Sequence, residues 1–199
     1  MSFKKNGYQI VKKVLSQETV KILSLQFDIL KDVQYHYMMK KENDYLGCEQ
    51  VTKSFAYYAP YTFEALLPYL QQTMEKITGK TLLPSNSYAR IYYNGAVLDK
   101  HKDRPHCEYS ATICIEDNDN PWDIWFEDRN GKEIPITLRP GDMAVYAGVE
   151  LAHWRNEYQG RKHTQTFLHY VDANGPYTDY KFSGRKMLGI NSRLMYKND

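Results

Sequence analysis

The sequence predicts an α+β fold that is mainly β, in which helices buttress a single β core. Two stretches, residues 16–32 and about 62–77, carry apolar side chains at helical spacing. From residue 84 onward the pattern changes to short alternating segments separated by turn residues. The chain has 199 residues, enough for one substantial hydrophobic core. We therefore expect one domain over residues 1–199, with a helical part at about 1–80, a β core at about 84–172 and a tail at 173–199.

The first helix should begin after Ser16, a residue that caps helices well. In the second helical stretch Pro68 should split or kink the helix, and Gly79 is a suitable residue to end it. Residues 37–61 lie between the two helical stretches and form a polar and aromatic segment in which apolar residues follow no sustained period. This segment is long for a connector, so we interpret it as a lid or a binding loop.

The β core should contain about six to eight strands, a number and spacing typical of a sandwich or barrel. Asn130-Gly131 is a signal for a two-residue hairpin, and Pro140-Gly141 fits a type II turn. The segments that predict strands are NSYARIYY, YSATICIE, WDIWFE, EIPITL, MAVYAG and HTQTFLHYV.

Charge and cysteine content exclude several classes of protein. The net charge is +2, from 26 basic and 24 acidic residues, which is too balanced to indicate a nucleic-acid or anionic-membrane partner. The three cysteines form no CxxC pair, which fits a reducing cytoplasmic compartment better than a disulfide framework. Because no apolar run approaches the ~18 residues of a membrane span, we expect a soluble cytoplasmic protein without a membrane partner.

A candidate metal site begins in LDKHKDRPHCEYSATICI, residues 98–115. His101 and Asp103 stand two residues apart, so on a strand both side chains point to the same face. Alone, this pair is more often a hydrogen-bonded or surface pair than a metal site. His153 follows a later strand, and two His with one carboxylate is the set that selects non-haem Fe(II) for oxygen chemistry. The alternative for His153 is an imidazole packed beside Trp154.

A second group of residues suits a dicarboxylate. In GRKHTQTFLHYV, Arg161, His163 and Gln165 fall on one strand face, and a guanidinium can bind a carboxylate bidentately. The alternative for Arg161 is a solvated charge at a strand end. Tyr92 and Tyr93 place one phenol on each face of an earlier strand.

Three segments taken in order resemble a known family. ARIYYNGAVLDKHKDRPHCEYSATICI, ITLRPGDMAVYAGVELAHWR and GRKHTQTFLHYV, spanning roughly residues 84–172, look like the Fe(II)- and 2-oxoglutarate-dependent dioxygenases of the prolyl 4-hydroxylase-like superfamily. The resemblance implies a double-stranded β-helix (jelly-roll-like) core. It also implies a hydroxylase that uses Fe(II), 2-oxoglutarate and O2, with ascorbate in a supporting role, and that releases succinate and CO2.

Carried over by position, the resemblance makes His101, Asp103 and His153 the iron ligands and Tyr92 a hydrogen-bond donor to 2-oxoglutarate. The family's basic residue stands nine or ten places after the distal His. Here Arg161 is at eight and His163 at ten, and we favour Arg161 without excluding His163. The substrate would be a protein or peptide, such as a prolyl residue, or a small molecule.

Three other interpretations stay open. One is a non-catalytic jelly-roll module that binds a peptide or carbohydrate through its Tyr and Trp side chains. Another is a cupin-like metalloenzyme, although cupins usually offer more His ligands than this chain can bring together. A third is a family member that has lost activity, which the displaced basic residue allows.

Overall fold

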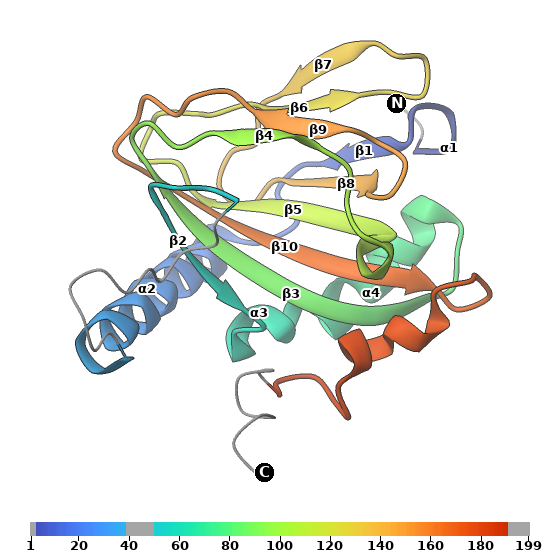
Figure 1. The fold of residues 1–199 in the computed structure, drawn as a ribbon, viewed down its shortest axis with the longest axis horizontal. Helices are drawn as coiled ribbons and strands as arrows, with labels where there is room; N and C mark the ends of the chain where they lie inside the picture. The colour runs from blue at the N-terminus through green and yellow to red at the C-terminus, as the bar shows by residue number, and fades with distance from the viewer. Residues whose placement is uncertain (1–2, 39–49, 191–199) are drawn as a thin grey trace.

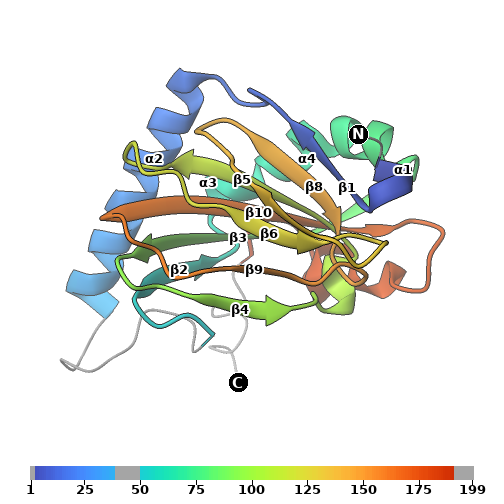
Figure 2. The ribbon, with the colours of Figure 1, turned by 90° about the horizontal axis from the view of Figure 1, so that it is seen from above.

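Two antiparallel sheets face each other, and the longer helices cover the outer face of the larger sheet (Figures 1 and 2). The computed structural model describes residues 3–38 and 50–190. Within these residues no helix is long and apolar enough to cross a membrane. The arrangement is mainly β with a few helices, which confirms the fold class predicted from the sequence.

The larger sheet has six strands, and its neighbours in space are far apart in the sequence. In spatial order they are β1 (Tyr8–Val11), β8 (Met143–Ala147), β5 (Tyr109–Glu116), β10 (Lys162–Asp172), β3 (Leu82–Tyr93) and β2 (Ser54–Tyr58). The smaller sheet has the order β4 (Leu98–His101), β9 (His153–Arg155), β6 (Ile124–Glu127) and β7 (Glu133–Ile136). From β3 to β10 the chain passes back and forth between the two sheets, which gives a jelly-roll core.

The helices begin and end largely where their capping residues predict. Ser16 Oγ accepts a hydrogen bond from the Thr19 backbone N–H at 3.2 Å, and Gly79 ends the second helical region with a left-handed φ of 71°. Pro68 lies in the first turn of α4, where its missing N–H costs nothing, and the predicted split falls just before it, at Ala65. The helices are α1 (Phe3–Asn6), α2 (Gln17–Val33), a π-helical turn (Gln34–Met38), α3 (Tyr61–Glu64), α4 (Leu66–Thr78) and 3₁₀ segments at Pro105–Cys107 and Thr178–Gly184.

The main hydrophobic core fills the space between the helices and the larger sheet. Phe27 of α2 packs against Phe55 of β2 and Phe63 of α3, with ring centroids 5.4 Å apart in both pairs. A second contact joins the two sheets, where Tyr8 of β1 stacks on Phe126 of β6 at 5.7 Å. Both faces of the larger sheet are therefore buried, which explains why β5 and β8 consist almost entirely of buried residues.

Two local predictions differ from the structure. Residues 54–58 of the segment interpreted as a lid or binding loop form β2, an edge strand that pairs with β3, while residues 39–49 lie outside the described part of the chain, where the interpretation stays a prediction. The hairpin between β6 and β7 has three loop residues instead of two, since Asp128 and Lys132 are still hydrogen-bonded and Gly131 alone takes a positive φ of 75°. This is the type I turn followed by a left-handed residue, which uses the same Asn-Gly signal.

The segment after β10, which the sequence left unassigned, folds back on β3 and is anchored by a buried ion pair. The Arg185 guanidinium contacts both carboxylate oxygens of Glu64, at 2.9 and 3.0 Å, and the side chains are 1% and 2% exposed. It also donates to the backbone carbonyls of Phe182, Ser85 and Ile190. All five of its donors are used, so this segment is part of the packed structure.

Candidate metal centre

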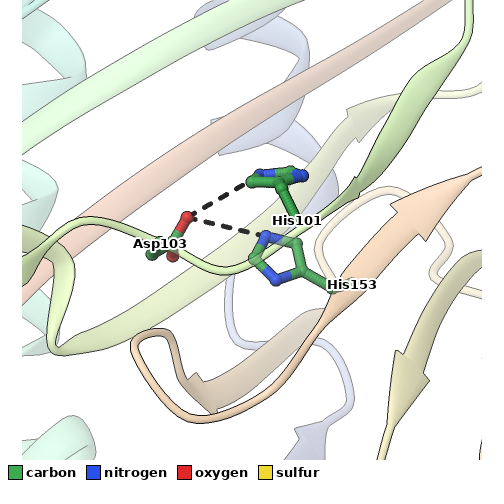
Figure 3. Close-up of side chains that lie close together, drawn as sticks. All are labelled: His101, Asp103 and His153. Atoms are coloured by element: carbon green, nitrogen blue, oxygen red, sulfur yellow. Dashed lines mark ion pairs between the residues drawn. The ribbon is translucent and has the colours of Figure 1, made fainter.

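Two paired strands of the smaller sheet, β4 and β9, bring His101, Asp103 and His153 together (Figure 3). His101 ends β4 and pairs in register with His153 at the start of β9, and Asp103 follows β4 by two residues. Asp103 Oδ1 lies 3.9 Å from His101 Nε2 and 3.6 Å from His153 Nε2. One donor atom from each side chain lies within 4.8 Å of the others, close enough for all three to bind a single ion.

Both imidazoles are oriented by the backbone of their own strand. His101 Nδ1 lies 2.7 Å from the carbonyl of Asp99, and His153 Nδ1 lies 3.1 Å from the carbonyl of Leu151. A carbonyl only accepts, so each Nδ1 carries a proton, and Nε2, which carries the lone pair in the neutral imidazole, is the atom that faces Asp103. This is the tautomer that a metal ligand needs, and it is fixed before any ion arrives.

Asp103 is held by contacts on two sides. Its Oδ2 accepts a hydrogen bond from Ser110 Oγ at 3.0 Å, and Ser110 Oγ lies 2.8 Å from His169 Nδ1. On the other side the Asp103 backbone N–H donates to the carbonyl of Gly148 at 2.9 Å. A Cβ at Gly148 would come within 2.6 Å of Asp103 Oδ2, so only glycine lets the carboxylate lie there.

Burial keeps the surrounding imidazoles neutral. Burial lowers the pKa of His153, an effect that the nearby Asp103 charge partly opposes. Burial also lowers the pKa of His169 to about 4. With the proton on Nδ1, a neutral His169 donates to Ser110 Oγ, and the single serine proton then goes to Asp103 Oδ2 at 3.0 Å or to the Cys107 carbonyl at 3.1 Å. His169, Ser110 and Asp103 thus form a short relay that fixes the carboxylate.

A pocket opens over these three side chains. His101 is 27% exposed, whereas Asp103 is 14% and His153 only 4% exposed, so solvent reaches the triad from the His101 side. The walls combine aromatic rings with a few polar groups, the composition that small-molecule sites usually have. Besides the triad they are formed by Gln50, Tyr88, Arg90, Tyr92, Leu98, Cys107, Tyr146, Phe167 and His169.

Of the three residues expected to bind 2-oxoglutarate, two are buried and one is exposed. Tyr92 on β3 is fully buried and lines the pocket. His163 on β10 is fully buried opposite Tyr92 in the register of the two strands. Arg161 is exposed, lies just before β10 and does not line the pocket. The structure therefore brings Tyr92 and His163 together but leaves Arg161 outside.

Sequence reasoning missed several polar residues around the centre. Ser110 and His169 contact each other behind Asp103, and Arg90 on β3 lines the pocket. Arg155 is 1% exposed and lies two residues after His153 on β9. The sequence does contain a signal for Arg155, because the strand period of two places it on the same face as His153, with Trp154 on the other face.

Comparison with known proteins identifies solved structures that have a similar fold. No protein-family model matches the chain, and no curated protein matches its sequence. Among solved structures, a prolyl-4-hydroxylase from Pseudomonas putida matches with a TM-score of 0.62 and 12% identity, over 84% of this chain and 94% of that one. HygX from Streptomyces hygroscopicus with nickel and 2-oxoglutarate bound matches with a TM-score of 0.66 and 12% identity, over 88% of this chain and 86% of that one.

Two further matches agree. The non-haem α-ketoglutarate-dependent epimerase SnoN from nogalamycin biosynthesis gives a TM-score of 0.67 at 15% identity, over 86% of this chain and 80% of that one. A prolyl hydroxylase in complex with a hypoxia-inducible factor peptide fragment from Trichoplax adhaerens has a TM-score of 0.64 at 12% identity, over 85% of this chain and 86% of that one. The chain thus has the jelly-roll fold of the prolyl 4-hydroxylase-like, 2-oxoglutarate-dependent oxygenases.

Proposed function

We propose that the chain is an Fe(II)- and 2-oxoglutarate-dependent oxygenase that hydroxylates its substrate. The observation that carries the proposal is the preformed set of His101 Nε2, Asp103 carboxylate and His153 Nε2 within 4.8 Å. Two His and one carboxylate leave part of the coordination sphere of an iron open, which is the arrangement that non-haem oxygenases use. The fold of the solved oxygenases described above supports this interpretation.

The ion and its co-substrate would supply the oxygen chemistry: bound Fe(II) activates O2 while 2-oxoglutarate is oxidised to succinate and CO2. The chain's own residues position these partners. His101 and His153 present fixed lone pairs, and the Ser110 hydroxyl orients Asp103. The buried aromatic wall of Tyr92 and Tyr146 keeps water from the inner side of the centre.

The substrate would approach from the His101 side, where the triad is most exposed. Solved structures of this fold hold different molecules, since one neighbour is in complex with a peptide fragment and another has hygromycin B bound. We propose that this chain hydroxylates a peptide, such as a prolyl residue, or a small molecule that fits the pocket. A binding module without a metal is disfavoured, because it gives no reason for two imidazoles and one carboxylate to bring their donor atoms within 4.8 Å of one another.

An anaerobic titration tests the proposal. Fe(II) and then 2-oxoglutarate are added to the protein, and the weak visible charge-transfer band of the chelate is recorded. We expect the band in the wild type and in His36→Ala, whose imidazole is exposed next to α2, and no band in His153→Ala. A wild-type protein that binds no Fe(II), or binds it without forming the band, would contradict the proposal.

A further inference from the structure

Three arginines are almost completely buried in the described part of the chain: Arg155 at 1% exposure, Arg90 at 3% on the pocket wall and Arg185 at 4%. The buried guanidinium of Arg185 is fully paired. Each of its five N–H groups donates to an acceptor, and the Glu64 carboxylate is its counter-ion. A buried charge without such partners is strongly destabilising. Arg155 departs from that pattern.

Among the described residues, the Arg155 guanidinium makes one hydrogen bond, from Nη1 to the backbone carbonyl of Trp122. Its Nε and Nη2 are buried and have no partner in this part of the chain. No carboxylate of the described residues lies within 4.0 Å of it, although the Trp122 ring stacks under the guanidinium at 4.9 Å. The ring offers a weak attraction and no counter-charge. A buried cation with two unused donors is therefore suited to bind an anion.

Two other buried donors lie beside Arg155. Tyr92 Oη and His163 Nδ1 also have no partner, and both rings pack on Trp122, with centroids 5.0 and 5.6 Å away. The Gln165 amide accepts from Thr112 and contacts His163 Nε2 at 2.7 Å, so in this orientation it donates to Nε2 and the proton of His163 is on Nδ1. The three side chains thus present guanidinium, phenol and imidazole N–H groups around one indole.

This donor cluster adjoins the metal centre. Arg155 and His153 are two residues apart on β9, so their side chains leave the same face of the strand with Cα atoms about 6.6 Å apart. Tyr92 belongs to both places, since its ring lines the pocket over the triad and also packs on Trp122. An anion held by Arg155 would lie on the inner side of the pocket, away from the exposed His101.

We infer that Arg155, with Tyr92, binds the distal carboxylate of 2-oxoglutarate, so that the cation comes from β9 instead of from β10. The inference rests on the proposed function, which supplies the dicarboxylate. Neither Arg155 nor Arg161 is among the residues that line the pocket, but Arg155 is buried against Trp122 together with Tyr92, which lines it, whereas Arg161 is exposed. Burial and the Arg155 charge hold the pKa of His163 well below its usual range, so His163 contributes a neutral N–H donor and no charge.

The test compares two ligands of equal chain length on the Mn(II)-loaded protein by calorimetry. 2-Oxoglutarate carries the distal carboxylate, and 2-oxopentanoate has a methyl group in its place. The variants are Arg155→Gln, Arg155→Lys and Tyr92→Phe, with Arg161→Gln as the matched control and Arg90→Gln as the test of the other buried arginine, which lines the pocket. Binding is the readout, so no turnover is required, and Mn(II) affinity is measured in each variant.

We expect the wild type to prefer 2-oxoglutarate, and Arg155→Gln to weaken its binding roughly 10- to 150-fold, the range for a hydrogen-bonded charged group. Binding of 2-oxopentanoate and Mn(II) should be unchanged in Arg155→Gln. Arg155→Lys should recover part of the preference, because it restores the charge without the planar fork. Tyr92→Phe should weaken 2-oxoglutarate binding less than Arg155→Gln does. Arg161→Gln should keep the wild-type preference, and Arg90→Gln should change that preference less than Arg155→Gln does.

Three outcomes would overturn the inference. In the first, Arg155→Gln keeps the wild-type preference for 2-oxoglutarate over 2-oxopentanoate. In the second, Arg155→Gln loses affinity for both acids equally, and in the third, the preference is lost in Arg161→Gln or Arg90→Gln instead. A wild-type protein that binds neither acid would overturn the proposed function itself, so the two failures are distinguishable. Removing an unpaired buried charge should not unfold the protein, and Arg155→Lys gives an independent reading if Arg155→Gln expresses poorly.

Discussion

Single residues around Asp103 hold this proposed metal ligand through two kinds of contact. Ser110 supplies a hydrogen bond from one side, and Gly148 supplies the space that the carboxylate occupies on the other. Neither residue offers an atom to the ion. Both therefore act by positioning, and their effect should appear in metal affinity before it appears in the stability of the fold.

Replacing Ser110 by Ala should weaken Mn(II) binding by about 10- to 100-fold, because Asp103 loses the donor that orients it. Electron paramagnetic resonance of free Mn(II) measures the dissociation constant. Ser87→Ala is the matched control, since the Ser87 hydroxyl is also buried on a strand but has no partner in the described part of the chain. Equal Mn(II) affinity in Ser110→Ala and the wild type would exclude the positioning role.

Gly148→Ala should also reduce Mn(II) affinity, since the new Cβ would lie 2.2 Å from the carbonyl of Cys107 and 2.6 Å from Asp103 Oδ2. Gly79→Ala serves as the control. It strains the left-handed end of α4 at φ 71°, but its Cβ would meet nothing within 4 Å. Thermal unfolding should detect the Gly79 change while metal binding stays normal, and the reverse pattern would contradict our account of Asp103.

The sequence was most informative about residues that share a strand or a short motif. The HxD spacing and a later His predicted the three side chains that the structure brings together. Ser110 and His169 could not be predicted as partners of Asp103, because strand pairing between β5 and β10 joins them across 59 positions. Arg155 could have been found from the strand period, but its lack of a counter-ion is visible only in the packed structure.

Secondary-structure elements position the site through the pairing of β4 with β9 and of β3 with β10. The first pairing sets His101 opposite His153, and the second sets Tyr92 opposite His163. β3 is in turn backed by α4 and by the segment after β10, which Arg185 anchors to Glu64 of α3. Helix caps and strand bounds followed from local sequence. β2 did not, since an edge strand is stabilised by its neighbour and by aromatic packing instead of by a clear period of two.

Breaking the anchor should loosen this backing. Arg185→Met leaves the Glu64 carboxylate buried and unpaired, and we expect a loss of about 3–5 kcal/mol in the free energy of unfolding. Urea denaturation measures it. The exposed pair Arg129–Glu150 is the comparison, because Arg129→Met should cost no more than about 1 kcal/mol. A similar small loss at both positions would show that the segment after β10 is not anchored by this ion pair.

At the scale of the whole molecule, the described part of the chain holds a buried cation, Arg155, that has no counter-ion there and lies next to the proposed metal ligands. Such an arrangement costs stability in the ligand-free protein and is compensated when an anion binds. The crossing of strands between two sheets brings these groups together from β3, β4, β9 and β10. That closure depends on pairings between distant segments, so the sequence alone could indicate a β core but not its strand order.

Thermal unfolding should show this coupling directly. With Mn(II) bound, 2-oxoglutarate at 100 times its dissociation constant should stabilise the wild type by about 2.7 kcal/mol. Arg155→Met should be at least as stable as the wild type without ligands, yet gain much less from 2-oxoglutarate at the same concentration. A ligand-free Arg155→Met protein that is several degrees less stable would mean that Arg155 serves the fold and not a ligand.

The most direct test of the central claim is a crystal structure of the protein with Mn(II) and 2-oxoglutarate. Our account predicts one ion bound by His101 Nε2, the Asp103 carboxylate and His153 Nε2, with 2-oxoglutarate extending inward to Arg155 and Tyr92. An ion bound elsewhere, or a 2-oxoglutarate whose distal carboxylate contacts Arg161 or Arg90 instead, would contradict it.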